Sequence, residues 1–129
     1  MKKLLPILAG AMLFTTSQTF AFEFTFDWGD IPLCTSGHPN RVNNPVFQLQ
    51  DLPEGTARID FKLVDLQVRN FNHGGGRVAG PFGATIEPGA FTYKSPCPPS
   101  GSHNYQWTAK AYDAGGKLLD TAQSTKRYP

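Results

Sequence analysis

A proline-dense segment in the second half of the chain limits the fold most strongly. It reads Lys94-Ser-Pro-Cys-Pro-Pro-Ser-Gly-Ser-His103-Asn-Tyr105. Each proline fixes its φ angle and lacks a backbone N–H donor, so this segment is neither a helix nor an inner strand of a sheet. We therefore expect a rigid loop from Pro96 to Gly101 that delivers His103 and Tyr105 to the start of a strand. Such a loop can hold an imidazole and a phenol against a ligand at a small ordering cost.

Apolar and polar residues alternate along several short stretches, which is typical of half-buried β-strands. No stretch shows a long helical period of 3.6 residues. The pattern predicts strands at 22–28, 46–49, 57–63, 91–93, 103–111 and 117–121, turns at 51–55 and 113–116, and loops at 29–44 and 70–83. The chain is thus predicted to be all-β, an antiparallel β-sandwich or flattened barrel with little helix.

The N-terminus has the pattern of a secretory signal peptide. Lys2 and Lys3 precede an apolar run of about 11 residues, shorter than the roughly 20 residues that a helix needs to cross a bilayer. Thr19-Phe20-Ala21 forms a small-x-small cleavage site before Phe22. We predict a signal peptide at residues 1–21, a single domain at 22–129 without a transmembrane segment, and a periplasmic or secreted location. A retained N-terminal anchor is the alternative.

The charge balance excludes one class of partner. The precursor carries 12 basic and 10 acidic residues, a net charge of +2. Loss of Lys2 and Lys3 with the signal peptide leaves 10 of each sign. The sequence has no run of basic residues and no stripe of aromatic and basic residues, so nucleic acid is not an expected partner.

The two cysteines, Cys34 and Cys97, both follow the cleavage site. An exported chain meets oxidising conditions, and two thiols with none left over predict one disulfide. It would close a loop of about 60 residues and stabilise the fold by roughly 4 kcal/mol in the chain-entropy model. A zinc site is the alternative, but neither cysteine lies in a C-x-x-C pair.

Asp65 and a run of three glycines each leave two interpretations open. Asp65 falls in phase with Ile59, Phe61 and Leu63, so a regular strand would point its carboxylate to the apolar side. An unpaired buried charge is costly, so either Asp65 has partners or the strand ends and Asp65 is solvated. Gly74-Gly-Gly76 follows His73 and suits either a loop that wraps a ligand or a flexible hairpin tip.

These motifs resemble, in their order, the phosphatidylethanolamine-binding protein family, also called Raf kinase inhibitor-like proteins. The resemblance covers nearly all of residues 22–129 and is strongest at the proline loop, which is similar to the family's Gly-Pro-x-Pro-Pro-x-Gly-x-His-x-Tyr segment. The chain departs from the family pattern at Gln67, where a second aspartate would stand, and it is shorter between His73 and Tyr93. The resemblance implies a compact bacterial exported variant. The segments that carry it are Pro53-Glu-Gly-Thr56, Val64-Asp65, Phe71-Asn-His73 and Tyr93 to Tyr105.

The resemblance also implies a site and a function. In that family a small anion-binding pocket is lined by the acidic motif, the histidines, the tyrosine and the loop prolines. It would hold a phospholipid headgroup or another phosphate-like group, and the module could also dock or inhibit a protein partner. No enzymatic activity, metal or cofactor is implied. The ligand-binding residues would be Asp65, His73, Tyr93, Pro96, His103 and Tyr105.

Two other functions remain open. The chain could be a hydrolase or metal-dependent enzyme that uses Asp65, His73 and His103, although no Gly-x-Ser-x-Gly elbow accompanies them. It could also be a structural domain of the envelope. Because histidine titrates near neutrality, a binding site of this kind is expected to hold anions more tightly as the pH falls toward about 6.

Overall fold

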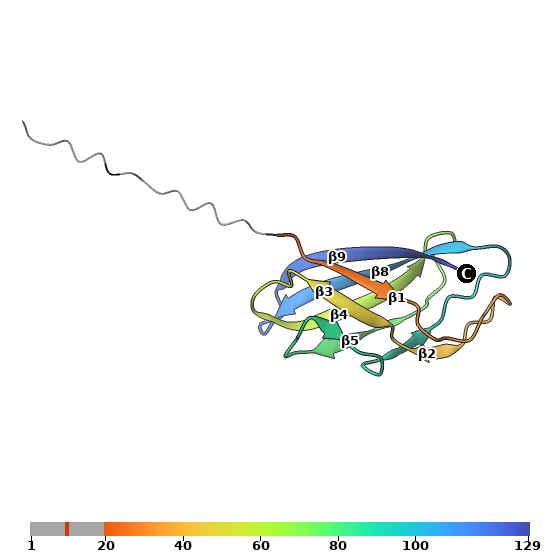
Figure 1. The fold of residues 1–129 in the computed structure, drawn as a ribbon, viewed down its shortest axis with the longest axis horizontal. Helices are drawn as coiled ribbons and strands as arrows, with labels where there is room; N and C mark the ends of the chain where they lie inside the picture. The colour runs from red at the N-terminus through yellow and green to blue at the C-terminus, as the bar shows by residue number, and fades with distance from the viewer. Residues whose placement is uncertain (1–9, 11–19) are drawn as a thin grey trace, which may run out of the picture.

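The computed structural model describes residue 10 and residues 20–129 (Figure 1). The predicted signal peptide therefore lies almost wholly outside the described residues. These residues form strands and no helix, which confirms the predicted all-β fold, and none of them belongs to a helix that could cross a membrane. The strands are β1 (Glu23–Asp27), β2 (Arg41–Asn43), β3 (Val46–Gln50), β4 (Thr56–Asp65), β5 (Gly75–Ala79), β6 (Thr85–Ile86), β7 (Thr92–Lys94), β8 (His103–Asp113) and β9 (Leu118–Tyr128).

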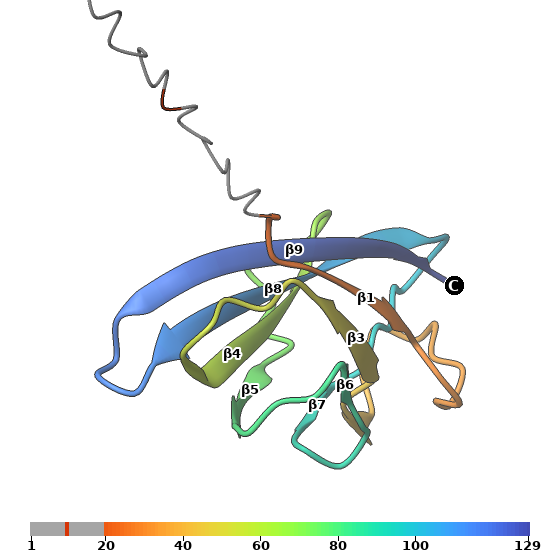
Figure 2. The ribbon, with the colours of Figure 1, turned by 60° about the vertical axis from the view of Figure 1, so that its left-hand side comes forward.

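The strands pair in three antiparallel sheets. The largest has the order β5-β4-β8-β9, the second has the order β1-β3-β6, and β2 pairs with β7 alone. Strand β1 runs alongside β9, as Figures 1 and 2 both show, so the second sheet lies against the first. Each sheet has open edges, which makes the arrangement sandwich-like.

Aromatic side chains from both larger sheets form the core. In β1, Phe24 and Phe26 are buried, while Glu23, Thr25 and Asp27, which alternate with them, are exposed, as the period of two predicts. Phe47 of β3 stacks on Phe61 of β4 with 4.2 Å between ring centroids, and its edge meets Trp107 of β8 at 5.3 Å. Such pairs add about 0.5–1.5 kcal/mol each beyond the area that they bury.

Strand β5 corrects the prediction for the glycine run. Gly75 and Gly76 lie in this strand, so they form neither a ligand-wrapping loop nor a hairpin tip. A Cβ on Gly75 would overlap the carbonyl oxygen of Phe61, and a Cβ on Gly76 would overlap the ring of Phe91. The glycines are there because β5 approaches β4 and the Phe91 ring too closely for any side chain.

Buried Asn44 fixes the connection between β2 and β3. Its Oδ1 accepts hydrogen bonds from the N–H groups of Gly89, Ala90 and Phe91, and its Nδ2 donates to the carbonyl oxygens of Pro45 and Glu87. This one amide satisfies four backbone groups of the β6–β7 connection and the carbonyl of Pro45 between β2 and β3. It allows β2 to form inside the stretch 29–44, which the sequence had predicted to be loop throughout.

Candidate functional site

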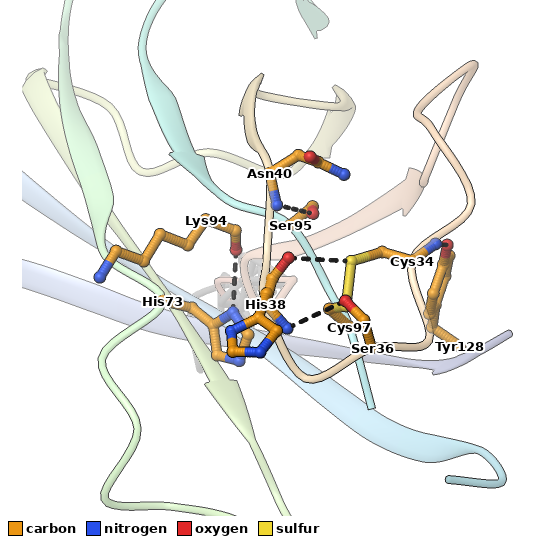
Figure 3. The surroundings of a disulfide bond; sticks show 9 residues. All are labelled: Cys34, Ser36, His38, Asn40, His73, Lys94, Ser95, Cys97 and Tyr128. Atoms are coloured by element: carbon orange, nitrogen blue, oxygen red, sulfur yellow. Dashed lines mark hydrogen bonds between the residues drawn. A yellow bond between two sulfur atoms is a disulfide. The ribbon is translucent and has the colours of Figure 1, made fainter. Parts of the chain in front are cut away.

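A disulfide joins two loops at one end of the sandwich. Cys34, between β1 and β2, is bonded to Cys97, between β7 and β8, which confirms the predicted pairing (Figure 3). The backbone N–H of Cys34 donates to the hydroxyl oxygen of Tyr128 at 3.0 Å, so the end of β9 is held to the same point. The disulfide thus fixes the first loop against the proline segment.

A cavity of about 190 Å³ lies beside the disulfide. Its volume is below the roughly 300 Å³ at which pockets for drug-sized ligands begin, so it suits a small chemical group. Four parts of the chain enclose it: the β1–β2 loop, the β4–β5 loop, the β7–β8 loop and the facing ends of β4 and β8. The lining residues are Gly37, Pro39, Asp65, Val68, Phe71, His73, Cys97, Pro99 and Tyr105.

Asp65, at the end of β4, is buried, and both of its carboxylate oxygens accept hydrogen bonds. Its Oδ1 accepts hydrogen bonds from the N–H groups of Gln67 at 2.9 Å and Val68 at 3.2 Å. Its Oδ2 accepts one from Nδ1 of His103 at 2.6 Å. Of the two interpretations that the sequence left open, the partnered carboxylate on the apolar side is the one found.

His103, the first residue of β8, lies behind Asp65 and is not among the residues that line the cavity. Its side chain is 16% exposed. Because Nδ1 donates to the carboxylate, only Nε2 remains for another partner. His103 therefore acts on the cavity through Asp65, whose carboxylate it orients.

His73 is buried and held by two hydrogen bonds to Lys94. Its Nδ1 donates to the carbonyl oxygen of Lys94 at 2.8 Å (Figure 3). The N–H of Lys94 donates in turn to the carbonyl oxygen of His73 at 2.8 Å. Burial lowers the pKa of the imidazole below its usual range, although the Lys94 carbonyl and the charge of Asp65 act in the opposite direction. The neutral ring then presents the unprotonated Nε2 as a hydrogen-bond acceptor.

Tyr105 also lines this cavity, and its hydroxyl is buried. Burial raises the pKa of this phenol above its usual range, and so does the charge of Asp65, while the N–H of Cys97 acts the other way. The Asp65 carboxylate and the Cys97 N–H both lie near the Tyr105 hydroxyl. Among the described residues, however, no group makes a hydrogen bond of ordinary geometry with this hydroxyl. The Tyr105 ring meets the His73 ring edge-on, with 5.5 Å between the centroids.

Tyr93 and Pro96 lie elsewhere. Both side chains are fully buried, and Tyr93 packs its ring against Trp107 at 4.9 Å. Neither is among the residues that line the cavity, so their part in ligand binding stays a prediction. One loop proline, Pro99, does form part of the wall, as the resemblance implies. The other wall residues were not expected from the sequence, namely Gly37, Pro39, Val68, Phe71 and Cys97.

A metal centre built on these side chains has no support in residues 20–129. No three His, Cys, Asp or Glu side chains of this part of the chain lie close enough together to share an ion. Asp65 and His103 bond to each other, and His73 is directed at a backbone carbonyl.

Comparison with known proteins adds no relative to this description. No protein-family model matches the chain, and neither a curated protein nor a solved structure is significantly similar to it. The resemblance to the phosphatidylethanolamine-binding proteins therefore stays a prediction that rests on the sequence motifs.

Proposed function

We propose that this protein is a binding module that holds a small anionic, phosphate-like group in the cavity between His73 and Tyr105. The observation that carries the proposal is Tyr105, whose side chain lines the cavity and whose buried hydroxyl has no hydrogen-bond partner among the described residues. A buried polar group without a partner costs about 1–3 kcal/mol. A ligand oxygen that accepts the phenolic proton would recover this cost.

The second donor comes from His73 when it gains a proton. Neutral His73 offers only an acceptor at Nε2, because Nδ1–H is used by Lys94. A bound anion favours the imidazolium form, in which Nε2–H becomes a donor toward the ligand. Binding is therefore coupled to the uptake of a proton. The Asp65 carboxylate already accepts three hydrogen bonds, two from backbone N–H groups and one from His103.

The remaining walls are mostly apolar. Pro39, Val68, Phe71 and Pro99 surround the polar floor together with the disulfide. Such walls exclude water and strengthen the hydrogen bonds within the cavity. They also give room for the first carbon atoms of a phosphate ester, so a phospholipid headgroup and a free phosphate monoester share the chemistry that this site would recognise.

Two tyrosines allow a matched test of this proposal. Residues 22–129 would be titrated with inorganic phosphate and with glycerophosphoethanolamine, with binding followed by the NMR signals of the histidine rings. A hydrogen bond to a charged group contributes about 1.5–3 kcal/mol, so Tyr105→Phe is expected to weaken binding about tenfold or more. Tyr93→Phe removes another buried, unpartnered hydroxyl, one that does not line the cavity, and is expected to change nothing. Equal binding by both variants would contradict the proposal.

One observation favours an enzyme as the second candidate. The 2.6 Å bond between Asp65 and His103 has the geometry by which a carboxylate orients a histidine base. The neighbouring serines are otherwise engaged: Ser95 is buried and accepts from the N–H of Asn40, while Ser102 donates to the carbonyl oxygen of Pro129. Turnover of a phosphoester or acyl ester that is lost in His103→Ala would establish the enzyme in place of the binding module.

The disulfide supports export as part of the same proposal, because such bonds persist in oxidising compartments. We expect a protein that begins at Phe22 in the periplasm or the medium. N-terminal sequencing of the purified protein after expression of the full chain checks this, and an intact Met1 in the membrane fraction would contradict it.

A further inference from the structure

The outer face of the sheet β5-β4-β8-β9 collects basic side chains that lie far apart in the sequence. In β4, Ile59, Phe61 and Leu63 are buried, so the residues between them point outward. Residues that pair across neighbouring strands point to the same side of a sheet. Asp60 pairs with both Arg77 and Lys110, so these two side chains also point outward. We call this outer surface the basic face; its charged residues are Arg58, Asp60 and Lys62 of β4, Arg77 of β5, Lys110 of β8 and Arg127 of β9.

The basic face carries a large net charge on a chain that is otherwise balanced. It holds five cations and one carboxylate, although residues 22–129 contain ten residues of each sign. The one carboxylate, Asp60, is shared by Arg58 at 3.0 Å and Arg77 at 3.6 Å. None of the salt bridges among the described residues involves Lys62, Lys110 or Arg127. The face therefore presents cations that no carboxylate of the described chain compensates.

The outward positions of the opposite sheet carry fewer charges. The charged residues there are Glu23 and Asp27 of β1, and Asp27 is paired with Lys126 of β9, while the other outward residues are uncharged, such as Thr25 and Gln48. The charge that no salt bridge compensates is thus concentrated on the basic face. A molecule of this kind turns its basic face toward a negative surface as it approaches.

The chemistry of the face separates the classes of anionic partner. Its one outward aromatic ring among the described strands, Tyr112, is covered by the guanidinium of Arg58 at 4.4 Å, so it offers no platform on which nucleic-acid bases stack. Exposed Leu118 is its one large apolar side chain with more than a third of its surface accessible, which is too little for the apolar centre of a protein interface. Cations on flexible stems, spread over a broad sheet between threonines and glutamines, match the phosphates of a lipid surface.

We propose that the basic face docks the protein reversibly on an anionic phospholipid bilayer. Each Lys or Arg that reaches such a surface strengthens binding about fivefold, and the attraction fades beyond a Debye length of about 10 Å at 0.1 M salt. Binding is therefore strongly salt-dependent and needs no insertion of apolar side chains. It uses a different surface from the cavity beside the disulfide and does not depend on it.

The test compares two double variants with the same change in net charge. Residues 22–129 would be sedimented with vesicles of roughly three parts phosphatidylcholine to one part phosphatidylglycerol, and with phosphatidylcholine alone. We expect binding to the anionic vesicles only, and a loss of about 25-fold in Lys62→Gln/Lys110→Gln. Both lysines are exposed and form no salt bridge among the described residues, so the variant is expected to fold. The control Arg41→Gln/Lys94→Gln removes two cations that face each other in the β2–β7 sheet and is expected to bind like the wild type.

Several results would overturn the proposal. These are equal losses in the two variants, equal binding to neutral and anionic vesicles, or vesicle binding that added salt does not weaken. A preference for an oligonucleotide or an acidic peptide over the vesicles would assign the face to that partner instead. Salt-sensitive self-association without vesicle binding would assign it to a second copy of the chain. Tyr105→Phe leaves the basic face intact, so the salt-sensitive part of the binding to anionic vesicles is expected to persist in this variant even if its cavity no longer binds a phosphate group.

Discussion

Opposing influences set the protonation of His73. Burial removes water from the ring and lowers its pKa, whereas the Lys94 carbonyl and the Asp65 charge favour the protonated form. Because burial is the largest of these influences, the folded chain binds a proton at His73 less readily than the unfolded chain does. This difference makes both stability and ligand binding depend on pH.

The first prediction concerns stability. The unfolded imidazole titrates near 6.5, and the folded one titrates lower. The contribution of His73 to the free energy of unfolding is thus fully present above pH 6.5 and is lost as the pH falls through the folded pKa. His73→Gln, whose amide can still donate to the Lys94 carbonyl, is expected to lack this dependence. Urea denaturation at a series of pH values below neutrality checks it, and parallel curves for the two proteins would contradict it.

The second prediction concerns the ligand. An anion beside His73 raises the pKa of the imidazole in the complex above that of the free protein. Affinity for inorganic phosphate is therefore expected to rise as the pH falls through the pKa of His73 in the complex and to level off below the lowered pKa of the free protein. Calorimetric titration in two buffers with different ionisation enthalpies would measure the proton uptake, and none would be seen if His73 played no part.

Among the elements, β5 approaches its neighbours too closely for a side chain at two positions. Gly75 and Gly76 lie against the Phe61 carbonyl and the Phe91 ring, so the strand depends on the absence of side chains there. Phe91 also stacks on the Phe61 ring at 5.8 Å. A change at either glycine therefore reaches the aromatic core and the β4–β5 loop that carries His73.

We predict that Gly76→Ala lowers the free energy of unfolding by about 1–3 kcal/mol, because an added methyl group displaces the Phe91 ring. Gly75→Ala is expected to cost more, since the obstacle there is backbone. Gly83→Ala serves as the control, because a Cβ at that position meets nothing within 4 Å and its φ angle is not positive. Thermal unfolding of the three variants checks the order, and a Gly76→Ala variant as stable as Gly83→Ala would contradict it.

The alternation of side chains predicted β4 and β8 well but only the first part of β9, which was expected at 117–121 and extends over Leu118–Tyr128. It did not predict β2, β5 or β6. Residues of β4 and β8 alternate clearly, and both strands lie where the pattern predicts them. Strand β6 has only two residues, and β5 begins with two glycines, so neither carries a readable period. Short strands of this kind form because their partners in the sheet are already in place, which is a property of the whole fold.

For the candidate site, three of the residues that the motif pattern names together, Asp65, His73 and Tyr105, line one cavity. It could not give the direction of Pro96, which is fully buried, because a proline ring can face either side of a loop. It also missed the basic face, since Arg58 and Arg127 meet on one surface only through the pairing of β4, β8 and β9. Spacing along the chain reveals neighbours within a strand, whereas register between strands requires the structure.

At the scale of the whole molecule, the Cys34–Cys97 disulfide links a loop in the first half of the described chain to a loop in the second half. Replacing both cysteines, in Cys34→Ser/Cys97→Ser, is expected to lower the free energy of unfolding by about 2–5 kcal/mol. Because Cys97 also lines the cavity, the same variant is expected to bind phosphate more weakly. Urea denaturation and the phosphate titration check the two effects, and wild-type protein under reducing conditions is expected to behave in the same way. A variant with unchanged stability would contradict this prediction.

The Cys34–Cys97 bond also has a mechanical consequence. If the ends of the chain are pulled apart, force passes through the sulfur atoms, and the residues between the cysteines form a closed ring that bears no tension. The cysteines are 63 positions apart in the sequence. At about 3.5 Å for each stretched residue, the ring hides about 220 Å of contour length until the bond is reduced. In a single-molecule pulling experiment, the oxidised protein is therefore expected to gain less contour length on unfolding than the reduced protein. The difference should equal the length of this ring.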